Sequence, residues 1–301
     1  MSNKSSKKSF GFYVIYIFAY LHALLPWWLL YIFSDILFIL IYYVVKYRRK
    51  LVSLNLRNSF PEKSDKEIKN LQKQFYHFLC DYFVETLKMV RMTKEEIGKR
   101  MKFTNPDMIN ELTKTGNSCL LSLGHYGNWE WVTSIGLYIE NNVKKGQVYK
   151  RLNSRAFDEF FLLVRERCTT KCIEMNEIYR TIILNKKEGN AMVIGFLSDQ
   201  HPPRYQDEYW TTFLNQDTLT LTGLEQIAAK MGFAIVYLDV KRIKRGYYEG
   251  AFKLITTDAS KEPKFSIMEK YMRNLEQTIL YDPAYYLWSH NKWKFKKQRT
   301  E

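Results

Sequence analysis

The strongest constraint on the fold is the stretch from residue 10 to residue 45, which contains no Lys or Arg and reads FGFYVIYIFAYLHALLPWWLLYIFSDILFILIYYVV. Its second part, from Trp27 to Val45, approaches the ~20 apolar residues that a helix needs to span a hydrocarbon core. Asp35, near the middle of that part, is costly inside a bilayer. We therefore predict a membrane-anchoring segment over residues 1–50 with one or more hydrophobic helices. Whether it spans the bilayer, re-enters it or packs as buried helices stays open.

The charge of the chain favours an anionic partner. The formal net charge is +15, and basic clusters lie on both sides of the apolar stretch and in the terminal segment KWKFKKQR. Basic residues beside a hydrophobic segment are typical of contacts with anionic membrane lipid, so we expect that lipid, and not nucleic acid, as the partner. A cleaved signal peptide is excluded, because the apolar stretch is too long and no small-residue cleavage site precedes KYRRK.

The four cysteines exclude two kinds of framework. They are too few and too scattered for a network of disulfides, which favours a reducing compartment. Cys168 and Cys172 have no second Cys or His pair nearby to complete a tetrahedral site. We therefore expect no metal.

Strand and helix patterns alternate along the rest of the chain. Short apolar runs predict strands over residues 118–123, 147–152, 191–197, 234–240 and 247–255. Helical patterns cover residues 64–90, 157–167, 176–187, 220–231 and a last helix from Ser266 that Asp282-Pro283 ends. Ser64 with Glu67, and Ser266 with Glu269, have the spacing of capping boxes. We predict an α/β fold with a central, mostly parallel sheet flanked by helices, and one catalytic domain over residues 51–301.

The segment LLSLGHYGNWEW carries the chemistry. His125 follows a buried strand at once, which is where open α/β sheets place ligands. Gly127 permits a sharp turn, and Asn128 is a suitable N-cap for a helix whose first turn holds Glu130. A His can remove the proton of an attacking hydroxyl, and a carboxylate on its other ring nitrogen fixes the tautomer. We predict His125 as the catalytic base and Glu130 as the carboxylate that supports it.

HYGNWE resembles the histidine-x4-acid motif of the lysophospholipid acyltransferase superfamily, and its GNWE context is similar to the late lauroyl/myristoyl acyltransferase branch of lipid A biosynthesis. Further segments resemble this branch in the same order, namely LLPWWLLYIFSDILFILIYYVVKYRRKLVSLNLRNSFPE, VYKRLN, SDQ, LTLTGLEQIAAKMG and YYLWSHNKWK. The resemblance implies a glycerolipid acyltransferase-like fold. It also implies a membrane-bound O-acyltransferase of a bacterial inner membrane that acts at the cytoplasmic face on a lipid A precursor. The donor would be acyl carrier protein thioester or acyl coenzyme A, used as a co-substrate without any cofactor.

Further residues are candidates for substrate binding. Asp199 and Gln200 follow the apolar run that predicts a strand over residues 191–197. Lys150 and Arg151 lie in VYKRLN, where the family tends to have a basic residue. Asn128 completes this set. The chain departs from the branch at Asp199-Gln200-His201-Pro202-Pro203 and at Phe213-Leu214-Asn215. The acyl length and the acceptor therefore stay open, with a lyso-aminolipid or a lysophospholipid as alternative acceptors. A non-catalytic membrane or nucleic-acid binding protein is the alternative from another class.

Overall fold

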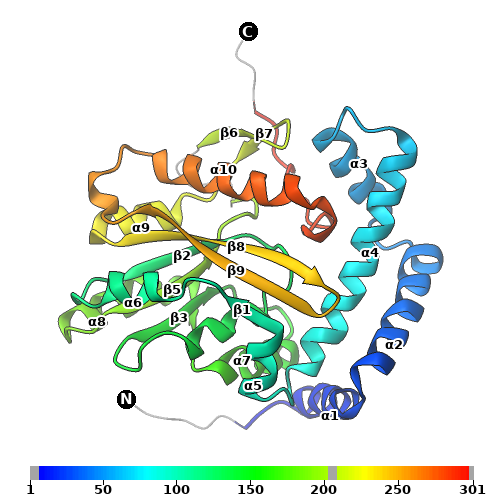
Figure 1. The fold of residues 1–301 in the computed structure, drawn as a ribbon, viewed down its shortest axis with the longest axis horizontal. Coiled ribbons are helices and arrows are strands. Elements are labelled where there is room, and N and C mark those ends of the chain that lie inside the picture. The colour runs from blue at the N-terminus through cyan, green and yellow to red at the C-terminus, as the bar shows by residue number, and fades with distance from the viewer. Residues whose placement is uncertain (1–6, 203–208, 298–301) are drawn as a thin grey trace.

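A seven-stranded sheet lies at the centre of the computed structural model, which describes residues 7–202 and 209–297 (Figure 1). Within these residues the strand order is β1-β9-β8-β2-β5-β3-β4, and β6 and β7 pair separately. The bounds are β1 Met101–Phe103, β2 Cys119–Leu123, β3 Lys144–Tyr149, β4 Lys171–Glu174, β5 Met192–Leu197, β6 Trp210–Phe213, β7 Gln216–Leu219, β8 Ala234–Lys244 and β9 Tyr247–Thr256.

Most neighbouring strands of the sheet run parallel. β2 pairs in parallel with both β5 and β8, and β3 pairs in parallel with β5 and β4. β9 runs antiparallel to β8 and parallel to β1. The carboxyl ends of β2, β3, β4, β5 and β8 therefore meet at one edge, where ligands bind in open α/β sheets. The predicted α/β fold with a mostly parallel sheet is confirmed.

Helices cover both faces of the sheet. Figure 1 shows α9 (Gly223–Met231) and α10 (Ser266–Tyr281) on one face, with α7 (Arg155–Arg165) and α8 (Ile178–Lys187) on the other. Further helices are α3 Arg49–Ser59, α5 Lys94–Arg100 and α6 Asp107–Thr113. The 3-10 helices are η2 Trp131–Leu137, η3 Glu166–Cys168, η4 Met175–Glu177, η5 Ala259–Lys261 and η6 Pro283–Tyr285. Every residue of β2 is buried, which explains why this strand reads as a continuous apolar run.

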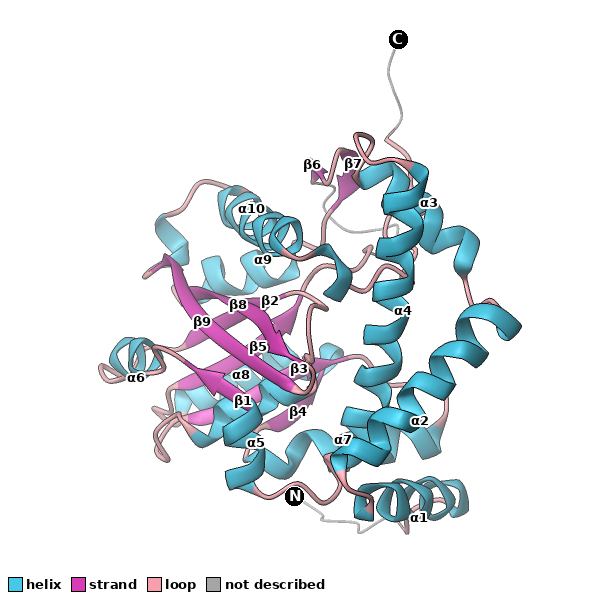
Figure 2. Cartoon of the chain, turned by 45° about the vertical axis from the view of Figure 1, so that its right-hand side comes forward, coloured by secondary structure: helices cyan, strands magenta, loops and turns pink. Residues whose placement is uncertain are grey.

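The long helix α4 (Asp65–Lys88) runs along the side of the sheet. Ser64 and Glu67 form the predicted capping box at its start, because Glu67 Oε2 accepts the Ser64 N–H at 2.8 Å while Ser64 Oγ accepts the Glu67 N–H. Figure 2 shows α4 between the sheet and α2. One side of α4 therefore contacts the core and the other contacts the N-terminal helices.

Two apolar helices precede α3. These are α1 (Phe10–Leu24) and α2 (Trp27–Ile39), and α2 continues as a π-helix, η1, over Leu40–Val45. Their inner faces pack against α4 and α7, but Phe18, Trp28 and Val44 on their outer faces are 63%, 66% and 67% exposed. The run Trp27–Val45 is long and apolar enough to cross a membrane by length and composition, and 22% of it is buried. The interpretation as a buried helix pair therefore holds for the inner faces alone.

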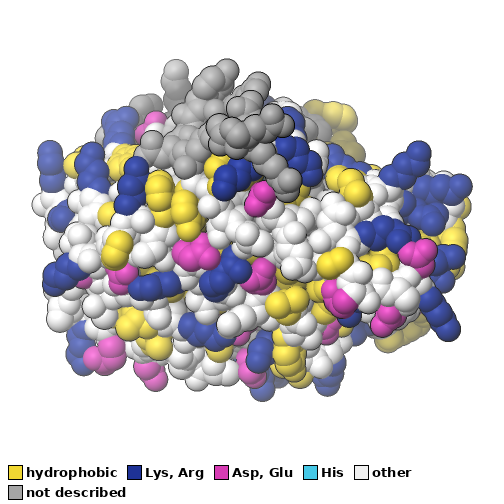
Figure 3. All heavy atoms as spheres, turned by 90° about the horizontal axis from the view of Figure 1, so that it is seen from above, with side chains coloured by type: hydrophobic (Ala, Val, Ile, Leu, Met, Phe, Trp, Pro, Cys, Tyr) yellow, Lys and Arg dark blue, Asp and Glu magenta, His cyan; other side chains and the backbone are white. Residues whose placement is uncertain are grey.

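Basic side chains gather beside these helices. Figure 3 shows Lys and Arg at the right-hand end of the molecule, where α3 and the start of α4 lie. Exposed basic residues just before α3, in α3 and in the first turns of α4 include Lys46, Arg48, Lys50, Arg57, Lys66 and Lys69. A cationic region thus adjoins the exposed apolar region, an arrangement that suits an anionic lipid surface.

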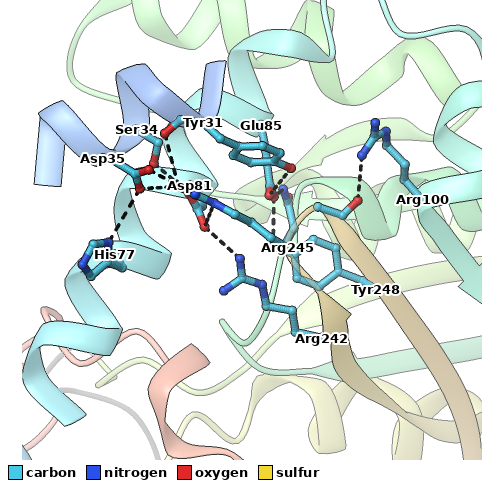
Figure 4. A network of polar contacts seen from close by, with 12 residues as sticks. Tyr31, Ser34, Asp35, His77, Asp81, Glu85, Arg100, Arg242, Arg245 and Tyr248 are labelled. Carbon is cyan, nitrogen blue, oxygen red and sulfur yellow. Dashed lines mark hydrogen bonds and ion pairs between the residues drawn. The ribbon is translucent and has the colours of Figure 1, made fainter. Parts of the chain in front are cut away.

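Asp35, whose position within the apolar stretch is costly in lipid, is paired in the structure (Figure 4). Arg245 Nη2 lies 2.6 Å from Asp35 Oδ1 and 2.6 Å from Asp81 Oδ1, and Arg242 Nη2 lies 2.8 Å from Asp81 Oδ2. Ser34 Oγ donates to Asp81 Oδ1 at 2.7 Å. The polar side chains of α2 therefore face α4 and the turn after β8, and attach the apolar helix to the domain.

One local expectation is wrong, and one pair of strands was not predicted. Ser266 and Glu269 form no capping box, because the N-cap of α10 is Phe265 and has no side-chain cap. Glu269 instead accepts hydrogen bonds from Tyr209 and Thr211. The β6–β7 hairpin, which holds the divergent Phe213-Leu214-Asn215 segment, was not predicted, because its turn uses Leu214 and Asn215 at positive φ where glycine is the usual signal.

Candidate functional site

The loop after β2 places His125 at the shared carboxyl edge of the strands. Gly124 has no room for a side chain, since a Cβ there would lie 2.5 Å from Leu275 Cδ1. Gly127 has φ +60°, a left-handed conformation that glycine adopts without strain. The loop is also held from the other side, because the Leu287 N–H donates to the His125 carbonyl at 3.1 Å. These constraints fix the backbone that carries His125.

His125 is paired with Asp199 and not with Glu130. His125 Nδ1 lies 2.7 Å from Asp199 Oδ1, and the His125 backbone N–H donates to Asp199 Oδ2 at 3.0 Å. Asp199 follows β5, the strand beside β2, so the two strand ends bring the pair together. The expectation that Glu130 occupies the second ring nitrogen is therefore corrected. Asp199, predicted as a substrate-binding residue, orients the imidazole.

The other ring nitrogen of His125, Nε2, lies beside Gln200. Gln200 Nε2 lies 3.4 Å from His125 Nε2. The Trp129 ring meets the imidazole edge-on at 5.2 Å, and Tyr82 of α4 stacks on Trp129 at 4.1 Å. Nε2 is thus the nitrogen that can accept a proton, and its ring is held by hydrogen bonds on one side and aromatic packing on the other.

The Asp199 carboxylate is buried and stays ionised. Burial alone would raise the pKa of Asp199, but the His125 charge and hydrogen bonds, together with the nearby Lys292 ammonium, hold that pKa well below its ordinary value. Lys292 Nζ donates to the Asp199 main-chain carbonyl at 2.5 Å. Lys292 belongs to the terminal segment expected on lipid head groups, yet it is only 4% exposed, so that expectation is wrong for this residue.

Glu130 lies in a separate ion pair. Its carboxylate accepts two hydrogen bonds from Arg165 of α7, from Nε at 2.7 Å and Nη2 at 2.6 Å, and one from the Tyr82 hydroxyl at 3.3 Å. Glu130 is buried, so this two-pronged contact supplies the charge partner that a buried carboxylate requires. Tyr82 connects the pair to the His125 environment, because the same ring stacks on Trp129.

Asn128 holds the loop from within, but the expected N-cap position is wrong, because the N-cap of η2 is Glu130. Its Oδ1 accepts the Trp131 N–H at 3.2 Å, at the start of η2. Its Nδ2 donates to Glu85 Oε2 at 2.8 Å, and the Tyr248 hydroxyl donates to the same oxygen (Glu85 and Tyr248 are labelled in Figure 4). Burial, with the charge of Asp81 adding to it, raises the pKa of Glu85 to about 7. Asn128 is fully buried, so its contacts are with the protein.

Lys150 and Arg151 lie at the same edge of the sheet as His125, directly after β3. Both are exposed, and Arg151 Nη2 forms an ion pair with Glu174 Oε2 at 2.9 Å. Of the divergent Asp199–Pro203 segment, His201 stacks on His290 at 5.2 Å, and Pro203 lies outside the described residues.

An apolar pocket lies beneath the loop, between η2 and the sheet. The space in it that a water-sized sphere can occupy is about 50 Å³, so the pocket is narrow. Leu123, Trp129 and Leu197 line it next to the strand ends, and Gly195 and Ile139 line it further down. Because Trp129 also contacts His125, the pocket begins beside the imidazole. Its lining suits a hydrocarbon chain.

No group of three or more His, Cys, Asp or Glu side chains that could hold a metal ion occurs in the described part of the chain. The predictions that the reaction uses neither metal nor cofactor remain predictions.

The sequence analysis did not identify the contacts that Asp199, Arg165, Glu85 and Lys292 make in the site. The role of Asp199 was recoverable, because SDQ ends the apolar strand that follows the helices after β2. Arg165 and Glu85 lie on remote segments, and nothing in their local patterns connects them to the HYGNWE loop. Lys292 lies in YYLWSHNKWK, which resembles the same family, but that pattern does not show its contact with Asp199.

Fold and site together define an α/β enzyme whose histidine, oriented by a buried carboxylate, can take a proton from a hydroxyl beside an apolar pocket. The chain matches the family described as bacterial lipid A biosynthesis acyltransferase over residues 3–295, nearly its whole length, and belongs to that family. It is therefore an acyltransferase of the lipid A and lipopolysaccharide biosynthesis type. A search among curated proteins found no match.

Proposed function

We propose that this chain transfers a fatty acyl group from an acyl thioester, carried by acyl carrier protein or coenzyme A, to a hydroxyl of a lipid A precursor. The observation that carries the proposal is the His125–Asp199 pair at the strand edge, in a member of this family. The donor and the acceptor are the finer parts of the proposal, and the apolar pocket beside His125 supports an acyl substrate.

In the proposed mechanism His125 Nε2 accepts the proton of the acceptor hydroxyl as its oxygen attacks the thioester carbonyl carbon. The new C–O bond forms, the C–S bond breaks, and the imidazolium returns its proton to the departing thiolate. Asp199 keeps Nδ1 protonated and stabilises the imidazolium, as in the histidine–carboxylate part of a serine-hydrolase triad. Acyl transfer is then direct, and no acyl-enzyme is formed.

In this proposal Glu130 supports the catalytic loop indirectly, through its ion pair with Arg165. The pair fixes α7 against the catalytic loop, and the Tyr82 hydroxyl extends the contact to α4. Lys150 and Arg151 provide positive charge at the same edge and would meet phosphate groups of the donor or the acceptor. Gln200, beside His125 Nε2, would hold the reacting hydroxyl.

We further propose that the enzyme lies on the cytoplasmic face of a bacterial inner membrane, with the outer faces of α1 and α2 in the lipid interface. Those faces are apolar and exposed, and basic residues adjoin them. Interfacial placement is favoured over a span, because removing α2 from the domain would leave the Asp35–Arg245 pair without its protein environment.

Two experiments test the proposed function. The purified enzyme is incubated with acyl carrier protein or coenzyme A thioesters and, in parallel, with a lipid A precursor, a lyso-aminolipid or a lysophospholipid. Acylation of the lipid A precursor is expected, and transfer to another acceptor alone would overturn the assigned substrate.

Cysteines placed at Lys8 and Lys50 should both resist an impermeant thiol reagent in intact cells. Labelling of only one of them would show that the segment spans.

A further inference from the structure

Lys292 is a buried ammonium that the proposed mechanism does not use. It lies in the segment after η6, and its side chain enters the core beneath the end of β5. Nζ donates to the Asp199 carbonyl at 2.5 Å and lies 5.2 Å from the centre of the Phe213 ring. A buried ammonium is costly unless an opposite charge faces it. The Asp199 carboxylate is the opposite charge that acts on Lys292.

Several titratable groups from different elements lie close enough to the Asp199 carboxylate to interact with its charge. His125 comes from the loop after β2, Lys292 and His290 come from the terminal segment, and the hydroxyls of Tyr271 and Tyr286 come from α10 and the strand-like stretch after η6. Burial lowers the pKa of His290 to about 4, so it is neutral at neutral pH, as are the two phenols. The charge balance around Asp199 is therefore set by His125 and Lys292.

This balance decides whether His125 can act as a base. A buried carboxylate on its own attracts a proton to the neighbouring imidazole, and an imidazolium cannot accept the proton of the acceptor hydroxyl. Lys292, bonded to the Asp199 main-chain carbonyl, supplies a buried positive charge close to the carboxylate and partly balances it. A second positive charge on His125 is then disfavoured in the resting site, while Asp199 still orients the ring through Nδ1.

We propose that Lys292 is a positioning residue that serves as the fixed counter-ion of Asp199, so that His125 enters the reaction as a neutral imidazole. This role rests on the proposed acyl transfer for its consequence, but the charge balance itself is a property of the site. Burial, opposed by Asp199, lowers the pKa of Lys292 to about 8, so the residue carries its charge at neutral pH.

The test measures the protonation of His125 without any substrate. Diethyl pyrocarbonate modifies neutral imidazole, and mass spectrometry of the His125 peptide gives the extent of modification between about pH 5 and pH 8. Lys292→Gln removes the charge and keeps a donor for the Asp199 carbonyl, whereas Lys292→Arg keeps the charge. Lys294→Gln is the matched control, because Lys294 is an exposed lysine of the same segment.

For Lys292→Gln, the midpoint of His125 modification should move upward by about one pH unit, while Lys292→Arg and Lys294→Gln remain near the wild type. If Lys292→Gln lowers the unfolding temperature strongly, Lys292→Met replaces it as the neutral variant. A midpoint unchanged in a folded neutral variant would overturn the proposal. So would an equal shift in Lys292→Arg, because the effect would then come from packing.

Acyl transfer supplies the second readout. At low pH the neutral variant should lose about tenfold in kcat with little change in KM, and recover as pH rises. Absence of acyl transfer by the wild type, together with the expected modification shift, would reject the proposed function and keep the role of Lys292. Normal acyl transfer by all variants, with no shift in His125 modification, would reject the role of Lys292 and keep the proposed function.

Discussion

Gly195 offers the sharpest test of the apolar pocket. It lies on β5, on the face that lines the pocket, four residues before Asp199. At a strand rise of about 3.3 Å per residue, this places it roughly 13 Å below the reacting histidine pair. An added Cβ would meet only Gln147 Cβ at 3.8 Å and a backbone oxygen at 3.9 Å, which are ordinary contacts. Gly195→Val should therefore fold and fill part of the pocket.

The size of the effect follows from the methylenes that valine displaces. Burial of one methylene contributes about 0.8 kcal/mol, which corresponds to about a fourfold change in relative kcat/KM. Displacement of two methylenes predicts that the preferred long acyl chain loses about fifteenfold against a chain shorter by that length. Gly195→Ala should show a smaller shift in the same direction.

The assay offers acyl thioesters of graded length in competition and determines the products by mass spectrometry. Gly223→Val is the matched control, because a Cβ there meets nothing within 4 Å and Gly223 does not line the pocket. An unchanged length preference in a folded Gly195→Val enzyme would refute the assignment of the pocket. An equal loss for all lengths would mean that the residue supports the fold.

Four further predictions concern the site and the membrane face. His125→Ala should lower kcat by about 10²–10⁴, with the fold kept in circular dichroism, because Asp199 retains the backbone N–H and the Lys292 ammonium. Glu130→Ala should lower the free energy of unfolding by about 3–5 kcal/mol in denaturant titration, since it leaves Arg165 unpaired; a fully stable but inactive variant would restore a direct catalytic role. The free energy of unfolding should decline as pH rises from about 4.5 to about 7, because the folded state binds the Glu85 proton more tightly than the unfolded state; Glu85→Gln should remove that decline. Ile36→Asp, on the exposed face of α2, should weaken flotation with anionic vesicles, and unchanged flotation would exclude that face from the interface.

The sequence predicted the elements that depend on local patterns. β2 and β5 are apolar on both faces, and the capping box at Ser64 uses residues three apart, so both are visible in a short window. Short strands such as β1 and β4 escaped, because three or four residues carry too little periodicity.

The candidate site was predicted in part for the same reason. His125 follows from its position after a strand, but its partner depends on which strands are neighbours. Glu130 is close in the chain and Asp199 is distant, yet β2 and β5 lie side by side and bring Asp199 to the imidazole. Sheet order, which one sequence does not encode locally, therefore decided the pairing.

The ion pair between Asp35 of α2 and Arg245 also affects when the enzyme can reach the membrane during its synthesis. Asp35 and Arg245 are separated by 210 positions, so at about 5–20 residues per second the ribosome needs roughly 10–40 s between them. During that interval the apolar helix carries a carboxylate without its cation, which opposes its lateral transfer into lipid by the translocon. We expect the nascent helix to wait for the β8–β9 hairpin, and the enzyme to reach the bilayer only after synthesis is nearly complete.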